Sequence, residues 1–254
     1  MYMRRIAVSN GKGGVGKTTT SANLGAALAR EGFRVLLVDM DPQQSLTDFF
    51  MIDTTDADAV SIAELIMTPQ LDPNGAVVSI TENLGIIPGS ERLAALDGAL
   101  LKLQDGTLRL KKVLSKVEGN YDYCIIDTPP SLSVFVQTAL MAAKDLIIPL
   151  KPNDMDMKAT EHFLETVDIV KEDNKELKVS GVVFTMTKNS KTQDTFSGMF
   201  KGHELENVVM KTKIRDTVKL GVSGAKGMDI FSFDPKGIGA QDYTNLAKEV
   251  ISWK

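Results

Sequence analysis

Gly11-Lys12-Gly13-Gly14-Val15-Gly16-Lys17-Thr18 is the stretch from which the fold of this chain can be predicted. It has the pattern G-x-x-x-x-G-K-[ST], in which glycines let consecutive backbone N–H groups turn toward phosphate oxygens. Residues 5–10 before it are typical of a short buried strand, and residues 19–30 after it are rich in Ala and Leu and are followed by Gly32. A strand, a glycine loop and a helix in this order predict a phosphate-binding P-loop.

The loop supplies most of the residues expected to hold a nucleotide. Lys17 would reach the β- and γ-phosphates, and the Thr18 hydroxyl would bind Mg²⁺. The predicted cofactors are therefore ATP and Mg²⁺. The predicted cofactor-binding residues of the loop are Gly11, Lys12, Gly13, Gly14, Val15, Gly16, Lys17, Thr18 and Thr19.

Lys12 is a second lysine in the loop, too far back along it to contact the same phosphate as Lys17. A solvated surface charge is one interpretation of it. The run KGGVGKTTT, residues 12–20, resembles the deviant Walker A motif of the ParA/MinD family of ATPases, and the chain resembles most the short, Soj-like ParA partition ATPases. This resemblance implies that Lys12 crosses a homodimer interface to the nucleotide of the partner subunit.

Carboxylates follow two of the predicted strands. Residues 34–38 lead into Asp39 and Asp41, and residues 123–126 lead into Asp127. Because ligands of parallel α/β sheets bind beyond the carboxyl ends of the strands, we expect these carboxylates beside the phosphates. The stretch D-x-D-P-Q resembles the switch I of the family, which implies that Asp41 positions the attacking water and that Asp39 supports the Mg²⁺ shell. Asp127 resembles a Walker B residue that holds this shell through water.

The resemblance implies an ATPase that hydrolyses ATP to ADP and phosphate at a slow intrinsic rate. The predicted catalytic residues are Lys12, Lys17 and Asp41, and the predicted metal-site residues are Thr18, Asp39 and Asp127. Residues 187–189 lie where the family reads the adenine, so Asn189 joins the predicted cofactor-binding set.

The remaining pattern predicts an α/β fold. Apolar runs predict strands at 146–150 and 179–184, a small strand pair at 77–80 and 84–87, and helices at 61–67, 90–103, 108–117 and 157–171. Strands that alternate with helices indicate a three-layer P-loop NTPase fold, a parallel sheet with helices on both faces. No repeat or linker interrupts the pattern, so residues 1–254 are expected to form a single ParA-type P-loop ATPase domain.

Charge is unevenly distributed along the chain. The formal net charge is −4, from 29 basic and 33 acidic residues, yet residues 188–226 hold eight basic and four acidic ones. Such a local patch can bind phosphate backbones, although solvated helix faces often look the same. The predicted DNA-binding residues are Lys211, Lys213, Arg215, Lys219 and Lys236. Arg215 is the strongest candidate, because it also matches the position of a basic segment in chromosome-type ParA proteins.

Several absences narrow the expected function. The single Cys124 excludes internal disulfides and, alone, a zinc or iron–sulfur site. The P-loop begins at residue 11, which leaves no room for the operator-binding domain of longer plasmid ParA proteins. No apolar run reaches membrane-spanning length and no basic amphipathic tail follows residue 254, so no membrane partner is expected. The expected location is the cytoplasm, with the ATP-bound form on the nucleoid.

The leading functional hypothesis is a DNA segregation (partition) ATPase. An ATP-bound homodimer would bind nonspecific DNA and would be released when a ParB-like or centromere-binding partner stimulates hydrolysis. One alternative is the same switch positioning a non-DNA protein cargo. Another is a metabolic P-loop enzyme of the dethiobiotin-synthetase type, against which Lys12 and the D-x-D-P-Q stretch argue. A MinD-like membrane switch is disfavoured by the missing tail.

Overall fold

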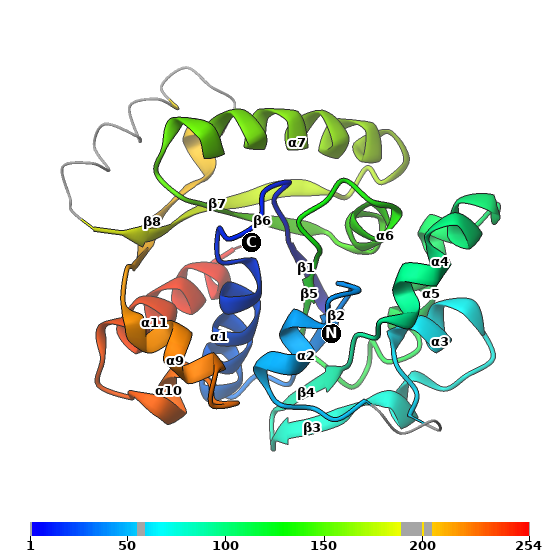
Figure 1. The fold of residues 1–254 in the computed structure, drawn as a ribbon, viewed down its shortest axis with the longest axis horizontal. Helices are drawn as coiled ribbons and strands as arrows, with labels where there is room; N and C mark the ends of the chain where they lie inside the picture. The colour runs from blue at the N-terminus through cyan, green and yellow to red at the C-terminus, as the bar shows by residue number, and fades with distance from the viewer. Residues whose placement is uncertain (1, 55–58, 189–199, 201–204, 254) are drawn as a thin grey trace.

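The computed structural model describes residues 2–54, 59–188, 200 and 205–253. Its centre is one eight-stranded sheet (Figure 1). The strands lie side by side in the order β3 (Val78–Thr81), β4 (Leu84–Ile87), β2 (Val35–Asp39), β5 (Tyr123–Asp127), β1 (Arg4–Val8), β6 (Asp145–Leu150), β7 (Lys178–Thr187) and β8 (Val209–Arg215). All neighbours are parallel except β3 and β4, which form an antiparallel pair. This arrangement confirms the predicted parallel-sheet α/β fold.

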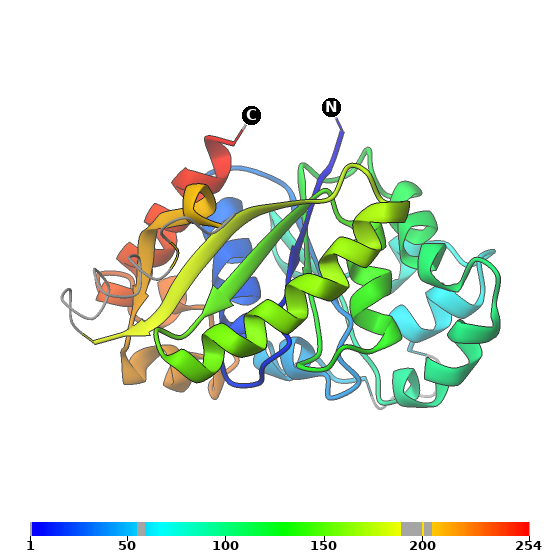
Figure 2. The ribbon, with the colours of Figure 1, turned by 90° about the horizontal axis from the view of Figure 1, so that it is seen from above.

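Helices cover both faces of the sheet (Figures 1 and 2). Side chains along a strand alternate between the faces: Leu36 and Val38 belong to one core cluster, and Val35 and Leu37 belong to the other. The first cluster packs against α3 (Ile62–Met67), α4 (Arg92–Lys102), α5 (Arg109–Ser115), α6 (Val134–Ala142) and α7 (Asp154–Asp173). The second packs against α1 (Lys17–Arg30), α2 (Ser45–Phe49), α9 (Val218–Gly224), α10 (Ile230–Phe233) and α11 (Ile238–Ile251).

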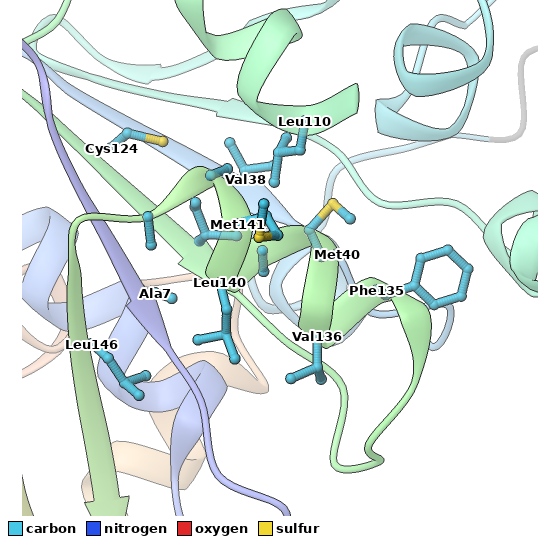
Figure 3. Packing of buried hydrophobic residues seen from close by; sticks show 14 of the residues in the cluster. Ala7, Val38, Met40, Leu110, Cys124, Phe135, Val136, Leu140, Met141 and Leu146 are labelled. Atoms are coloured by element: carbon cyan, nitrogen blue, oxygen red, sulfur yellow. The ribbon is translucent and has the colours of Figure 1, made fainter. Parts of the chain in front are cut away.

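Met40 anchors the segment between the two switch I carboxylates. Its side chain is fully buried in the first cluster, and Figure 3 shows it beside Phe135 and Met141 of α6. Its backbone N–H donates to the carbonyl of Asp127 at 3.0 Å. This bond holds the end of β2 beside the end of β5, so Asp39 and Asp127 lie next to each other on adjacent strands.

The sequence predicted most elements, with several differences at their boundaries. The first strand ends at Val8 because Ser9 and Asn10 already belong to the loop, and α1 begins two residues earlier than expected. The helix expected to begin at Ser90 begins at Arg92. Gly32 ends α1 as predicted, with a left-handed φ of 92°. The pattern gave no expectation for α2, α6 or the strand β8.

The outer edge of β8 is covered by carboxylates from α11. The two oxygens of Glu249 accept from the backbone N–H groups of Lys211 and Thr212 at 2.9 and 3.0 Å. Asp242, two turns earlier on the same face of α11, accepts from the N–H of Arg215 at 2.9 Å. These contacts give Glu249 a structural role, since it satisfies donors that a strand edge leaves unpaired.

In the part of the chain that the structure describes, no helix is long and apolar enough to cross a lipid bilayer.

Candidate nucleotide-binding site

The P-loop connects β1 to α1 and is shaped by glycines and by Asn10. Gly14 and Gly16 have φ angles of 71° and 88°, in the left-handed region that side chains other than glycine rarely adopt. The Asn10 side chain donates to the carbonyl of Pro149 at 2.8 Å and accepts from the N–H of Lys12 at 3.1 Å. Asn10 thereby ties the start of the loop to the end of β6.

Lys17 is the first residue of α1, and its side chain is almost completely buried. Its ammonium donates to the backbone carbonyl of Lys12 at 2.8 Å, across the loop. Burial lowers the pKa of Lys17, while the charges of Asp127 and Asp41 oppose that shift. A cation held inside the loop in this way is suited to binding phosphate oxygens.

Asp127, at the end of β5, accepts hydrogen bonds from two hydroxyl groups of α1. Thr18 and Ser21, three residues apart on one face of the helix, donate to its two carboxylate oxygens at 2.8 and 2.7 Å. Burial, and then the charge of neighbouring Asp39, raise the pKa of Asp127 to about 7. Burial likewise raises the pKa of Asp39 to about 6.

The charges around Lys17 fit a divalent cation. Two buried carboxylates, those of Asp41 and Asp127, act on one ammonium, and buried Asp39 acts on Asp127, so acidic side chains outnumber this cation at the site. Among the described residues, no cluster of three acidic, His or Cys side chains is arranged to enclose a metal ion. A cation here would therefore take further ligands from phosphate oxygens and water, as Mg²⁺ commonly does. Thr18 and Asp127 are the residues placed to hold it.

Asp39 and Asp41 are only two positions apart in the sequence, but their carboxylates have different surroundings. Asp41 faces a cavity of about 340 Å³ beside the loop, and its carboxylate accepts from the N–H of Gln43 at 2.9 Å. Asp39 is completely buried, and its oxygens accept from the backbone of Asp41, Leu46 and Thr47. Asp39 therefore fits an indirect role behind the metal site.

Two cavities meet at the P-loop. The first, of about 340 Å³, is lined by Gly13, Gly14, Gly16, Lys17, Thr18, Thr19, Asp41, Ser45, Thr128, Pro130 and Met186. The second, of about 420 Å³, has a mostly apolar lining: Gly16, Thr19, Thr185, Met186, Ile214, Arg215, Asp216, Thr217, Val218, Leu220, Gly221, Val222 and Tyr243. Gly16, Thr19 and Met186 line both. A cavity at a phosphate loop that is lined by Lys17 and Asp41 and shares residues with a more apolar cavity has the dimensions expected for a nucleotide.

Two predicted loop residues have structural roles, and one candidate lies outside the described residues. Val15 is buried, and its carbonyl accepts from Thr185 at 2.8 Å. Gly11 packs closely on α7, where a Cβ atom would stand 3.4 Å from that of Phe163. Asn189, the candidate for the adenine, is not among the described residues.

The five DNA-binding candidates come from β8, α9 and the connection between α10 and α11, which gather at one end of the molecule (Figure 1). Two of them form ion pairs: the Arg215 guanidinium makes hydrogen bonds of 2.6 to 3.1 Å to the carboxylate of Asp242, and Lys219 lies 2.8 Å from Asp234. Lys211 and Lys213 share the face of β8 opposite the buried Met210 and Ile214. Lys236 is exposed. Arg215 is therefore a weaker DNA candidate than its position in the sequence indicated.

Sequence reasoning missed Asn10, Ser21, Thr185 and Met186. Ser21 could have been predicted from its spacing, because it lies one turn beyond Thr18 on the same helix face. Met186 has an unusual backbone, with φ at 51°, in a residue that lines both cavities. Nothing in the local sequence around it indicates that conformation.

The buried carboxylates predict a pH dependence of stability in the metal-free protein. Because the pKa values of Asp127 and Asp39 lie above those of unfolded Asp, the folded state binds more protons between roughly pH 4 and pH 7, and the free energy of unfolding falls as pH rises through that window. Asp127→Asn removes one of these titrations. Thermal melting from pH 5 to pH 8 should therefore show a smaller decrease in Tm for Asp127→Asn than for the parent. Exposed Asp168→Asn is the control, and equal pH slopes for all three proteins would contradict the prediction.

Comparison with known proteins agrees with this geometry. Residues 3–179 match the AAA_31 family, described as an AAA domain. The chain is 38% identical over 253 residues to the sporulation initiation inhibitor protein Soj of Bacillus subtilis, covering 97% of this chain and 98% of that protein. It is 33% identical over 248 residues to the chromosome-partitioning ATPase Soj of Treponema pallidum, covering 96% and 95%. Among solved structures, cobyrinic acid a,c-diamide synthase of Mycobacterium smegmatis with a bound ATP analogue and magnesium has a TM-score of 0.84 and 32% identity, covering 98% of this chain and 94% of that one.

Proposed function

The chain belongs to the AAA_31 family and, within it, to the Soj/ParA group of partition ATPases, and on this premise we propose that it is an ATP-driven dimerisation switch that binds DNA. The observation that carries the proposal is the charge distribution of the site. Buried Lys17 and Asp127 lie at the P-loop together with Thr18, which donates to Asp127, and Asp41 faces the cavity that Lys17 and Thr18 line.

The proposed chemistry assigns a separate task to each group. The loop N–H groups and Lys17 bind the β- and γ-phosphates, and Thr18 with Asp127 holds Mg²⁺, which neutralises phosphate charge. The neighbouring apolar cavity accepts the nucleoside. Asp41 orients the attacking water. Since a carboxylate is a weak base and most of the catalysis is positioning, the intrinsic turnover is expected to be slow.

Lys12 is proposed to act on the nucleotide of a second subunit. Its contacts to Asn10 and Lys17 use its backbone N–H and carbonyl, and these two contacts do not depend on the side chain. A cation supplied in trans would stabilise charge on the transferred phosphoryl group, as an arginine finger does. Dimerisation and hydrolysis would then depend on the same residue.

DNA binding is proposed to use Lys211 and Lys213 on β8 together with Lys236. The dimer doubles this patch, so binding should require ATP and fall steeply with salt, because each phosphate contact releases about one counterion. A ParB-like partner carried by the cargo would stimulate hydrolysis and release the dimer. The ATP-bound protein would then be found on the nucleoid.

An electrophoretic shift assay with nonspecific duplex DNA tests this surface. The hydrolysis-deficient Asp41→Ala protein should retard DNA with ATP and not with ADP. Lys211→Ala/Lys213→Ala in that background removes four lysines from the dimer, so it should weaken binding at least roughly tenfold and lower the salt slope by up to about 4. The control is Lys144→Ala/Lys175→Ala, which removes equal charge from exposed sites before β6 and β7. Equal losses from both pairs would assign the effect to net charge alone. No ATP-dependent retardation of the Asp41→Ala protein would favour a non-DNA cargo.

A metabolic activity is the second candidate, because a protein of comparable similarity is described as a diamide synthase. That reading predicts ATP turnover that depends on a small substrate and no ATP-dependent dimer. Light scattering of Asp41→Ala separates the two, since the switch should double in mass with ATP and remain a monomer with ADP.

A further inference from the structure

The carboxylate of Asp39 connects the nucleotide site with a distant turn of the chain. One of its oxygens accepts from the N–H of Asp41 at 3.1 Å. The other accepts from the N–H of Leu46, and from both the N–H and the hydroxyl of Thr47, at 2.8 to 3.1 Å. Because Asp39 is completely buried, these donors fix the position of Asp41 relative to α2.

The Thr47 hydroxyl extends this connection by one further bond. While it donates to Asp39, it accepts from the backbone N–H of Gly89 at 2.8 Å, and Thr47 is itself completely buried. A hydroxyl has one proton and two lone pairs, so both bonds can exist together. Gly89 lies 42 residues from Thr47, in the turn between β4 and α4.

The turn containing Gly89 positions the surface formed by α3 and α4. The carbonyl of Pro88 accepts from the N–H of Ile62, the first residue of α3, at 2.9 Å. Arg92, the first residue of α4, donates to Glu64 of α3 at 2.8 Å. A displacement of the turn would therefore move both helices.

Gly89 is packed so closely that only glycine fits there without displacing Asp39. A Cβ atom at this position would stand 2.9 Å from the carboxyl carbon of Asp39 and 3.0 Å from one of its oxygens. Gly89 does not have a left-handed φ, so the close approach, and not the backbone conformation, requires glycine.

We propose that Thr47 is a positioning residue of the ATPase, whose hydroxyl couples Asp39 and Asp41 to the Pro88–Gly89 turn, so that a change at the phosphates is transmitted to the α3–α4 surface. The inference rests on the proposed function and adds a path from the nucleotide to a surface outside the site. The path consists of buried hydrogen bonds between named groups, each of which can be removed singly.

Thr47→Val removes the hydroxyl and keeps the shape of the side chain. Misplacement of Asp41 should lower kcat for ATP roughly tenfold while KM changes much less, because the phosphate-binding loop is untouched. Hydrogen exchange supplies a readout independent of activity. In the parent, Mg²⁺ with an ATP analogue should change protection in residues 10–20 and in residues 86–93. In Thr47→Val the change at 86–93 should disappear and that at 10–20 should remain.

Two matched variants control this experiment. Thr47→Ser retains the hydroxyl and should restore kcat and the exchange response. Thr138→Val makes the same substitution in α6, where the hydroxyl is buried and has no hydrogen-bond partner among the described residues, and it should behave as the parent. Loss of activity in both valine variants would show a general packing effect and overturn the proposal.

Gly89→Ala tests the same path from its other end. The added methyl group should displace Asp39 and lower kcat, whereas Gly98→Ala on α4, where a Cβ meets nothing within 4 Å, should not. Parent-like kcat and exchange in both Thr47→Val and Gly89→Ala would overturn the inference while the ATPase assignment stands. A parent protein that neither binds nor hydrolyses ATP would overturn the proposed function and this inference together.

Discussion

Lys17→Ala is expected to lower ATP hydrolysis by roughly 10²–10³-fold, the usual cost of removing a cation or donor from developing phosphoryl charge. The Lys17 ammonium is buried inside the loop and faces the carboxylates of Asp41 and Asp127, so its removal leaves their negative charge and that of the phosphates without this cation. Phosphate release under saturating Mg²⁺ and ATP measures the effect.

The control for Lys17→Ala is Lys175→Ala, an exposed lysine before β7. It should hydrolyse ATP at the parent rate. Near-ultraviolet circular dichroism of both variants would establish that each retains its tertiary packing. Hydrolysis by Lys17→Ala at the parent rate would mean that the P-loop does not bind the reacting phosphates.

Lys12→Ala is expected to prevent ATP-dependent dimerisation and to lower hydrolysis by roughly 10³-fold or more, the range typical of cations supplied in trans. The contacts of the Lys12 backbone with Asn10 and Lys17 do not involve the side chain, so they should remain after the substitution. Binding of a fluorescent ATP analogue to the monomer should therefore change little. Light scattering in the Asp41→Ala background measures the dimer.

Mixing experiments separate a role in trans from a role within one subunit. Lys12→Ala supplies no cation and Asp41→Ala does not hydrolyse, so neither protein alone should be active. In a mixed dimer the Lys12→Ala subunit retains Asp41 and receives Lys12 from its partner, which should restore activity to that site. No recovery on mixing, with dimers present, would place Lys12 within its own subunit's site.

The sequence was sufficient for the parts of the site that occupy contiguous stretches. The P-loop, Asp41 and Asp127 could be predicted because each follows a buried strand, and the carboxyl ends of parallel strands meet at one edge. The contacts of Asn10 with Pro149 and of Thr47 with Gly89 could not, because they join residues 139 and 42 positions apart. The periodicity of apolar residues in a sequence does not predict contacts between residues so far apart.

Two elements, α6 and β8, were not predicted from the sequence, and each has a physical reason. Helix α6 was not predicted, since it is buried on nearly every side and so lacks the alternation of polar and apolar faces on which such predictions depend. Strand β8 was not predicted either, although buried Met210 and Ile214 alternate with polar residues, as they do in a strand. The pairing of Arg215 with Asp242 emerges only when α11 packs beside β8.

The carboxylates of α11 on the edge of β8 affect how copies of the protein can associate. The N–H groups that Asp242 and Glu249 satisfy are those to which a strand from another molecule would add. Extension of the sheet at that edge would displace two carboxylates and strip Arg215 of its partner. This edge of the sheet is therefore protected against the addition of a strand from another copy of the chain, the step from which amyloid-like stacking grows.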